Sequence, residues 1–276
     1  MHLYLLQHNL EPEIYSMGFL LEFIEFLKER GKKDFRIHLK LDTGMHRLGF
    51  LPTEIGAVLE KLINQEQVKV QSFFTHLVAS GDPHLDEFTE LQIESYQAAA
   101  QELEIGLGYK FIRHVANTSA IPRWKNAHMD MVRLGIGLYG VDMGGTLPNL
   151  EQISSLKTTV TQIKDLPKGE TVGYDRKGVL TRDSRIATVK IGYADGYSRR
   201  FGNSVGKMQI NGFLAPTIGN ICMDMCMLDI TGQDVQVGDE VVVFPNIMES
   251  AIDIGTIPYE LLVNISSRVK RIYYYE

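Results

Sequence analysis

The sequence has no long hydrophobic run, no excess of basic residues and almost no cysteine. A membrane-spanning helix needs about 20 consecutive apolar residues, and the apolar stretch at residues 19–27 is broken by Glu22 and Glu25. The net charge of −6 argues against nucleic-acid binding, which requires a basic face. Cys222 and Cys226 suit a reducing compartment, and no further ligand at metal-site spacing accompanies them. No secretory signal opens the chain, so we expect a cytoplasmic protein without membrane, nucleic-acid or metal partners.

The first half of the 276 residues alternates strand-like and helix-like patterns. Short β-type runs are expected at residues 3–7, 35–41, 68–75, 110–115 and 129–133. Amphipathic helical spacing separates the middle three runs. Repeated strand–helix units predict a parallel sheet of the α/β-barrel type, with catalytic groups at the C-terminal ends of the strands.

The second half changes character after about residue 150. Gly, Asp and Thr separate short β-type runs, which we place at residues 185–191, 207–210, 225–230 and 240–244. The change predicts two domains, an α/β domain over residues 1–152 and a mainly β domain over residues 153–276.

Polar residues follow the predicted strand ends of the first half: Asp42, His76, Asn117 and Arg133. Asp42 stands in an Asp-Thr-Gly triplet, which could indicate an aspartic protease. Such a site needs an apolar flank and a partner carboxylate, and Lys40 lies just upstream. We therefore expect Asp42 to cap a turn.

Several segments carry, in order along the chain, the motifs of one enzyme family. They are KLDTGMHRLG at 40–49, FFTH at 73–76, HVANTS at 114–119, MVRLGIGLYG at 131–140, VKIGYADGY at 189–197, GNICMDM at 219–225 and TIPYE at 256–260. Each alone has an ordinary explanation, such as an exposed Tyr193 in a glycine-rich turn or a structural His76. Together they resemble the alanine racemase family of fold-type III pyridoxal-phosphate enzymes.

The resemblance implies an isomerase that interconverts L- and D-alanine for peptidoglycan precursors. Tyr193 would be one of two catalytic bases and would act in the partner's site of a homodimer. His76 and Arg133 would support it, with Arg133 facing the pyridine nitrogen of pyridoxal phosphate. A guanidinium cannot readily protonate that nitrogen, because its own pKa is too high. Lys40, as a possible N6-carboxylysine, would orient Arg47.

The resemblance also implies binding residues. Arg47 and the backbone amide of Met223 would contact the substrate carboxylate. The cofactor would be bound by Asn117, Thr118, Gly135, Ile136 and Tyr259. Ser119 follows Thr118, and either hydroxyl could contact the phosphate. Asn220 stands where many relatives have an arginine.

One family motif does not occur in these residues. In the family, the second base is the lysine that forms a Schiff base with the cofactor, in a Lys-Ala-x-Ala-Tyr-Gly context on the first barrel strand. We therefore expect a partial TIM-type α/β barrel lacking its first strands, followed by a mainly β domain. The isolated chain should bind the cofactor weakly and be inactive. A racemase of another amino acid, a related decarboxylase and a non-catalytic truncated module remain alternatives.

Overall fold

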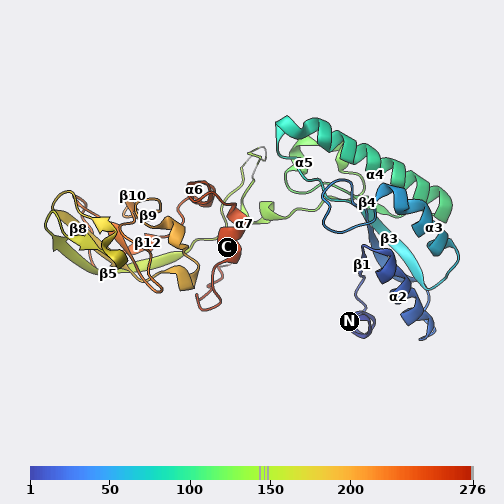
Figure 1. Cartoon of the computed structure of the whole chain (residues 1–276), viewed down its shortest axis with the longest axis horizontal. Helices are drawn as coiled ribbons and strands as arrows, with labels where there is room; N and C mark the ends of the chain where they lie inside the picture. The colour runs from blue at the N-terminus through green and yellow to red at the C-terminus, as the bar shows by residue number, and fades with distance from the viewer. Residues whose placement is uncertain (143, 146, 148, 275–276) are drawn as a thin grey trace. The chain divides into compact units, whose positions relative to one another are not determined.

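The computed structural model describes residues 1–142, 144–145, 147 and 149–274. By their own contacts these residues divide into two compact units, Met1–Leu150 and Glu151–Glu276, which are considered separately (Figure 1). Within the described ranges, no helix combines the length and apolar character needed to cross a membrane.

The first unit is built on a four-stranded parallel sheet. Its strands, in spatial order, are β1 (Glu13–Ile14), β2 (Phe35–Lys40), β3 (Val68–Phe74) and β4 (Ile112–His114). Its helices are α1 (His2–Gln7), α2 (Met17–Lys28), α3 (Ile55–Ile63), α4 (Asp86–Leu107) and α5 (Ala120–Arg123). A helix follows each of the first three strands, so the sheet has the strand–helix repeat that the sequence predicts, and all C-terminal strand ends lie at one edge.

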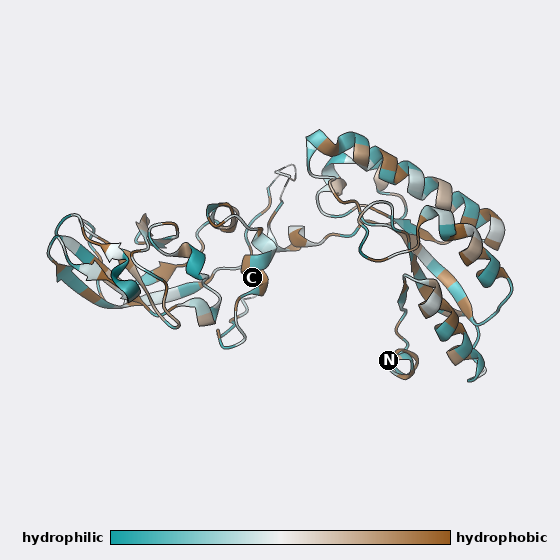
Figure 2. Cartoon of the chain, in the orientation of Figure 1, coloured by the Kyte–Doolittle hydropathy of each residue, from teal (hydrophilic) through white to brown (hydrophobic). Residues whose placement is uncertain are grey.

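The core of this unit lies between the helices and the sheet. Phe23 of α2, Val58 of α3 and Tyr96 of α4 are fully buried together with Phe73 of β3. The Tyr96 hydroxyl donates to the Phe73 carbonyl at 2.6 Å, which satisfies the only polar atom of that side chain. Hydrophobic and hydrophilic residues are interleaved along α4 (Figure 2), as expected of a long helix with one buried face.

Two predicted strands of the first half are wrong. Residues 3–7 lie within helix α1, because a short apolar run without strict alternation fits a helix as well as a strand. Residues 129–133 form no strand, because Met129 adopts a positive φ of 47°. The Arg133 amide nevertheless donates to the Ala116 carbonyl at 3.0 Å, so Arg133 still lies beside the end of β4.

The second unit is mainly antiparallel β structure. Its six-stranded sheet has the order β10-β9-β12-β5-β8-β11, and β6 pairs with β7 separately. The bounds are β5 (Lys157–Leu166), β6 (Thr171–Val172), β7 (Gly178–Val179), β8 (Ser184–Val189), β9 (Lys207–Ile210), β10 (Phe213–Pro216), β11 (Cys226–Asp229) and β12 (Glu240–Val242). Helices α6 (Ile247–Asp253) and α7 (Pro258–Val263) follow. All four predicted runs contain strands (β8, β9, β11 and β12), while β5, β6, β7 and β10 were not predicted.

Candidate active site

The C-terminal edge of the parallel sheet gathers the predicted polar residues of the first unit. Lys40 ends β2, and His76 follows the end of β3 by two residues. Asn117 follows β4, and backbone pairing to Ala116 places Arg133 beside it. Parallel strands end at the same edge, so these residues lie at one edge of the sheet although they are far apart in sequence.

Arg133 is held by four hydrogen bonds from its two terminal nitrogens. One nitrogen donates to His114 Nδ1 at 2.5 Å and to the His114 carbonyl at 2.9 Å. The other donates to the carbonyls of Thr75 at 2.7 Å and Val115 at 3.2 Å. These bonds use all four terminal hydrogens. Among the described residues the Nε–H of Arg133 has no partner, so this donor is free for a ligand acceptor.

Three cations surround His76. Burial, and after it the charges of Arg133, Arg47 and Lys40, lower the pKa of His76 to about 4, so the imidazole is neutral at physiological pH. The Phe74 ring is close to two of these cations, with its centroid 5.6 Å from Lys40 Nζ and 5.4 Å from Arg133 Cζ. A neutral histidine among three cations is an arrangement that attracts anions.

The loop that carries Arg47 is folded around Asp42. One Asp42 oxygen accepts the amides of Gly44 at 2.9 Å and His46 at 3.0 Å. Burial raises the pKa of Asp42, but the hydrogen bonds from these amides outweigh it and leave the pKa below its usual value. The loop returns to the sheet because Phe50 exchanges backbone hydrogen bonds with Lys40 and Asp42. Asp42 therefore caps a turn, as the sequence predicts.

Lys40 is nearly buried, with 8% of its surface exposed. Its Nζ lies 3.2 Å from a carboxylate oxygen of Glu13 on the neighbouring strand β1. Glu13 was not singled out from the sequence, because no local pattern shows that a residue 27 positions away faces Lys40 across paired strands.

Thr118 and the loop at Gly135 form a small polar cradle. The Thr118 hydroxyl oxygen accepts the amides of Gly135 at 2.8 Å and Gly137 at 3.4 Å. Its hydrogen remains available to an acceptor, as does the neighbouring Ile136 amide, which has no partner among the described residues. A phosphate group accepts such donors, so the cradle fits the phosphate of pyridoxal phosphate.

Asn117 holds this cradle in place. Its amide nitrogen donates to the Leu77 carbonyl at 2.9 Å, and its oxygen accepts the Ser80 hydroxyl at 2.9 Å and the Ala120 amide at 3.1 Å. Its side chain therefore ties the loops after β3 and β4 together.

The turn that carries Tyr193 belongs to the second unit and rests on another loop. The amides of Tyr193 and Ala194 donate to the carbonyls of Cys222 and Met223, each at 3.0 Å. Gly192 makes this close approach possible, because an added Cβ would lie 2.3 Å from the Cys222 oxygen. Tyr193 is 43% exposed, so its side chain is accessible to a ligand.

A second exposed tyrosine, Tyr174, contacts the same loop and was missed in the sequence. The Asn220 side chain donates to the Tyr174 carbonyl at 3.3 Å, and Tyr174 is 69% exposed. The next two residues, Asp175 and Arg176, both adopt positive φ, of 57° and 54°. Backbone strain of this kind clusters at functional sites. The one feature of the sequence that could have indicated Tyr174 is its position directly after Gly173.

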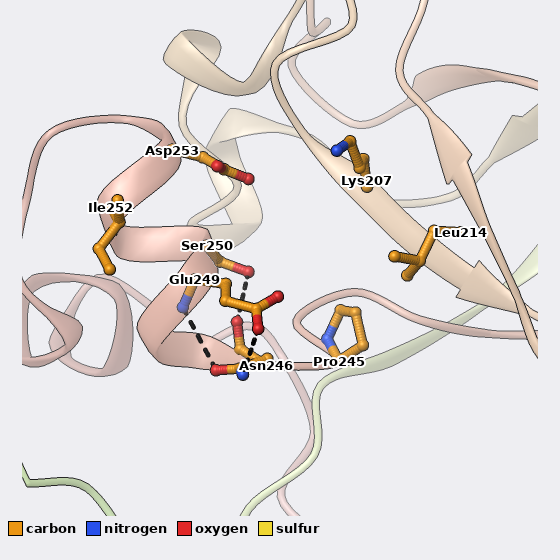
Figure 3. Close-up of a pocket in the computed structure, with 8 residues that line it drawn as sticks. All are labelled: Lys207, Leu214, Pro245, Asn246, Glu249, Ser250, Ile252 and Asp253. Carbon is orange, nitrogen blue, oxygen red and sulfur yellow. Dashed lines mark hydrogen bonds between the residues drawn. The ribbon is translucent and has the colours of Figure 1, made fainter. Parts of the chain in front are cut away.

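The remaining predicted residues of the second unit are also accessible. Met223 is exposed beside the Tyr193 turn, and its amide has no partner in the described part of the chain. Tyr259 is exposed on α7. A shallow pocket of about 180 Å³ lies elsewhere in this unit, between α6 and strands β9 and β10 (Figure 3). None of the predicted site residues lines this pocket.

Comparison with known proteins agrees with this geometry. Residues 2–143 match the family model "Alanine racemase, N-terminal domain", and residues 153–273 match "Alanine racemase, C-terminal domain". The chain is 37% identical to the alanine racemase of Clostridium tetani, over 97% of this chain and 72% of that protein.

Two solved structures are also similar. The alanine racemase of Clostridium difficile 630 has a TM-score of 0.83 and 34% identity, over 93% of this chain and 69% of that one. The alanine racemase from Bartonella henselae, with covalently bound pyridoxal phosphate, has a TM-score of 0.89 and 29% identity, over 98% and 75%. The predicted resemblance, fold class and cofactor dependence are confirmed. The chain belongs to the alanine racemase family, whose members are pyridoxal-phosphate-dependent isomerases.

Proposed function

We propose that this chain supplies most of the active site of an enzyme that interconverts L- and D-alanine. The observation that carries the proposal is the cluster of Lys40, Arg47 and Arg133 around the neutral His76. A substrate carboxylate and a cofactor with phosphate and phenolate groups are the anions that such a cluster suits. Pyridoxal phosphate, when bound, supplies the electron-withdrawing ring that makes loss of an α-proton feasible.

The first domain, over residues 1–152, would bind the cofactor. Thr118 and the amides of Gly135 and Ile136 would hold its phosphate, on a loop that Asn117 positions. Arg133 would direct its free Nε–H at the ring nitrogen without protonating it.

Residues that would bind the substrate occur in each domain. Arg47, oriented by Lys40, would bind the substrate carboxylate. In the second domain, over residues 153–276, the Met223 amide would contact a substrate carboxylate, and Tyr259 would approach a cofactor phosphate.

The proton would be exchanged by a phenol from the second domain. Tyr193 is the base predicted from the sequence, supported by its exposure and its fixed backbone. Tyr174, which is more exposed and precedes two residues with positive φ, is the second candidate. Loss of a general base typically costs 10²- to 10⁴-fold in rate. Comparing the rates of Tyr193→Phe and Tyr174→Phe therefore shows which tyrosine is the base.

The comparison requires a chain that also carries a cofactor-binding lysine. We would join the 276 residues to the N-terminal segment of the Clostridium tetani relative and follow α-proton exchange of both alanine enantiomers in D₂O. A large loss in exchange from one enantiomer only is expected for the variant that lacks the base. Full activity of both variants with both enantiomers would refute a tyrosine base.

For the 276 residues alone, the absent lysine motif predicts weak, reversible binding of pyridoxal phosphate. Borohydride reduction should then attach the cofactor to no lysine. A stoichiometric adduct on one lysine would contradict this expectation while leaving the racemase assignment intact.

We also infer a cytoplasmic homodimer in which Tyr193 of one subunit acts in the partner's site. Free Cys222 and Cys226 support the reducing compartment. Mixing Tyr193→Phe and Arg133→Ala subunits of the joined chain tests the dimer. Activity that neither variant shows alone is expected if each site draws on both subunits, and its absence argues against shared sites.

A further inference from the structure

A continuous series of hydrogen bonds crosses the parallel sheet behind Arg133. Arg133 contacts His114 Nδ1 at 2.5 Å, and His114 Nε2 lies 3.0 Å from the Ser72 hydroxyl. That hydroxyl lies 2.6 Å from His38 Nδ1, and His38 Nε2 lies 3.0 Å from a carboxylate oxygen of Glu11. We call this series the Arg133–Glu11 relay.

The donors of the relay all point one way. A guanidinium can only donate, so His114 Nδ1 must accept and His114 must carry its proton on Nε2. The low pKa of His114, about 4, agrees with this neutral ring. His114 then donates to the oxygen of Ser72, whose single hydrogen points to His38 Nδ1. The proton of His38 is left on Nε2, where it donates to the carboxylate of Glu11.

Packing holds the middle of the relay in place. Ser72 is 1% exposed on β3, so water cannot readily replace its hydroxyl. The His114 ring stacks on Phe74 with centroids 4.9 Å apart and an interplanar angle of 6°, which fixes the ring plane. Hydrogen bonds in such a series polarise one another, so each donation toward Glu11 makes His114 Nδ1 a better acceptor for Arg133.

We propose that Ser72, His38 and Glu11 are positioning residues for Arg133. By fixing the His114 tautomer they hold one terminal nitrogen of the guanidinium, and they thereby aim its free Nε–H. The importance of the Arg133–Glu11 relay for the reaction rests on the proposed function, in which Arg133 faces the cofactor ring. The relay itself belongs to the first unit and requires no bound cofactor.

Nitrogen-15 NMR of the histidine rings in the full chain tests the proposal. His114 and His38 should each show a protonated Nε2 and an unprotonated Nδ1 at neutral pH, with signals assigned from His114→Asn and His38→Asn. In Ser72→Ala the His38 signals should shift toward the average of two exchanging tautomers. The hydrogen-bonded Arg133 Nη proton should shift upfield. Thr89→Val is the matched control, because it deletes a buried hydroxyl of α4 whose one partner among the residues that the structure describes is the Leu85 carbonyl.

A protonated Nδ1 on His114 in the unaltered chain would overturn the proposal. Unchanged His38 and Arg133 signals in Ser72→Ala would do so as well. If Ser72→Ala fails to fold, the more accessible His38 replaces it: His38→Ala should shift the Arg133 signal, and His38→Asn, which keeps an acceptor near Nδ1, should restore it. These spectra do not require catalysis. Their outcome therefore does not depend on whether the chain shows racemase activity.

Discussion

Arg268 donates from Nε to Asp195 at 2.7 Å, and this bond ties the C-terminal segment to the turn that carries Tyr193. A terminal nitrogen of the same guanidinium donates to Asp224 at 2.6 Å. Burial raises the pKa of Asp195, but the hydrogen bonds from Arg268 and the Gly192 amide outweigh it and lower that pKa overall. One arginine thus joins the two loops of the second unit that contain Tyr193 and Met223.

Replacing Arg268 by alanine should loosen the Tyr193 turn. The amides of Tyr193 and Ala194 should exchange hydrogen faster, by up to about fivefold. This factor corresponds to the roughly 1 kcal/mol that an exposed ion pair contributes at most. Hydrogen exchange followed by mass spectrometry measures this. Arg182→Ala removes a comparable pair with Asp229 and should leave the turn unchanged. Equal exchange in all three proteins would show that Arg268 does not hold the turn.

Gly192→Ala should separate the two loops by steric conflict. The backbone at Gly192 has a φ of −148°, which alanine tolerates, so the cost comes only from the added Cβ meeting the oxygens of Cys222 and Met223. Overpacking of this kind costs about 1–3 kcal/mol. Gly18→Ala in α2 meets nothing within 4 Å and should be neutral or stabilising by up to about 1 kcal/mol. Urea unfolding followed by circular dichroism distinguishes the two variants, and equal stabilities would contradict the packing argument.

Acid should destabilise the first unit through the half-buried His76 and the buried His114. The folded pKa values of His76 and His114 are about 4, below the ordinary value of 6.5. The unfolded chain therefore binds protons that the folded chain does not, and stability falls as the pH drops from about 6.5 to about 4. Trp124 is the only tryptophan and lies in this unit, so its fluorescence in urea reports the unit directly.

His76→Gln should remove roughly half of this histidine-dependent loss, because two groups share it. His84→Gln changes an exposed histidine and should keep the slope of stability against pH. A slope that His76→Gln leaves unaltered would mean that folding does not shift the pKa of His76.

Thr118→Val should weaken binding of pyridoxal phosphate by about tenfold or more, the scale of one hydrogen bond to a charged group. Thr118→Ser keeps the hydroxyl and should bind normally. Ser119→Ala should also bind normally, because only Thr118 contacts the Gly135 amide. Absorbance titration gives the affinities. A larger loss of affinity in Ser119→Ala than in Thr118→Val would indicate that the Ser119 hydroxyl, and not that of Thr118, binds the phosphate.

Local patterns were sufficient where a strand ended in a polar residue. Lys40, His76 and Asn117 follow runs of β character that alternate with helical spacing, and parallel pairing brings such ends together. The same reasoning failed for residues 3–7, where helix and strand patterns look alike. It failed again at residues 129–133, where the positive φ of Met129 prevents an extended strand.

Contacts between distant segments could not be predicted. Nothing near Arg133 in the sequence indicates that its guanidinium bonds to three backbone carbonyls and one imidazole. Tyr174 was missed because its importance depends on a turn conformation and on Asn220, 46 residues away.

The sequence by itself determined the family, the fold class and most of the candidate residues, because these depend on residue types in a fixed order. The tertiary structure decided which atoms remain free to act. Pairing of β2, β3 and β4 aligns His38, Ser72 and His114 behind Arg133, and within the described ranges the hydrogen bonds of Arg133 leave its Nε–H without a partner. The reason is physical: hydrogen-bond direction depends on distances between strands, and those distances exist only after the sheet has formed.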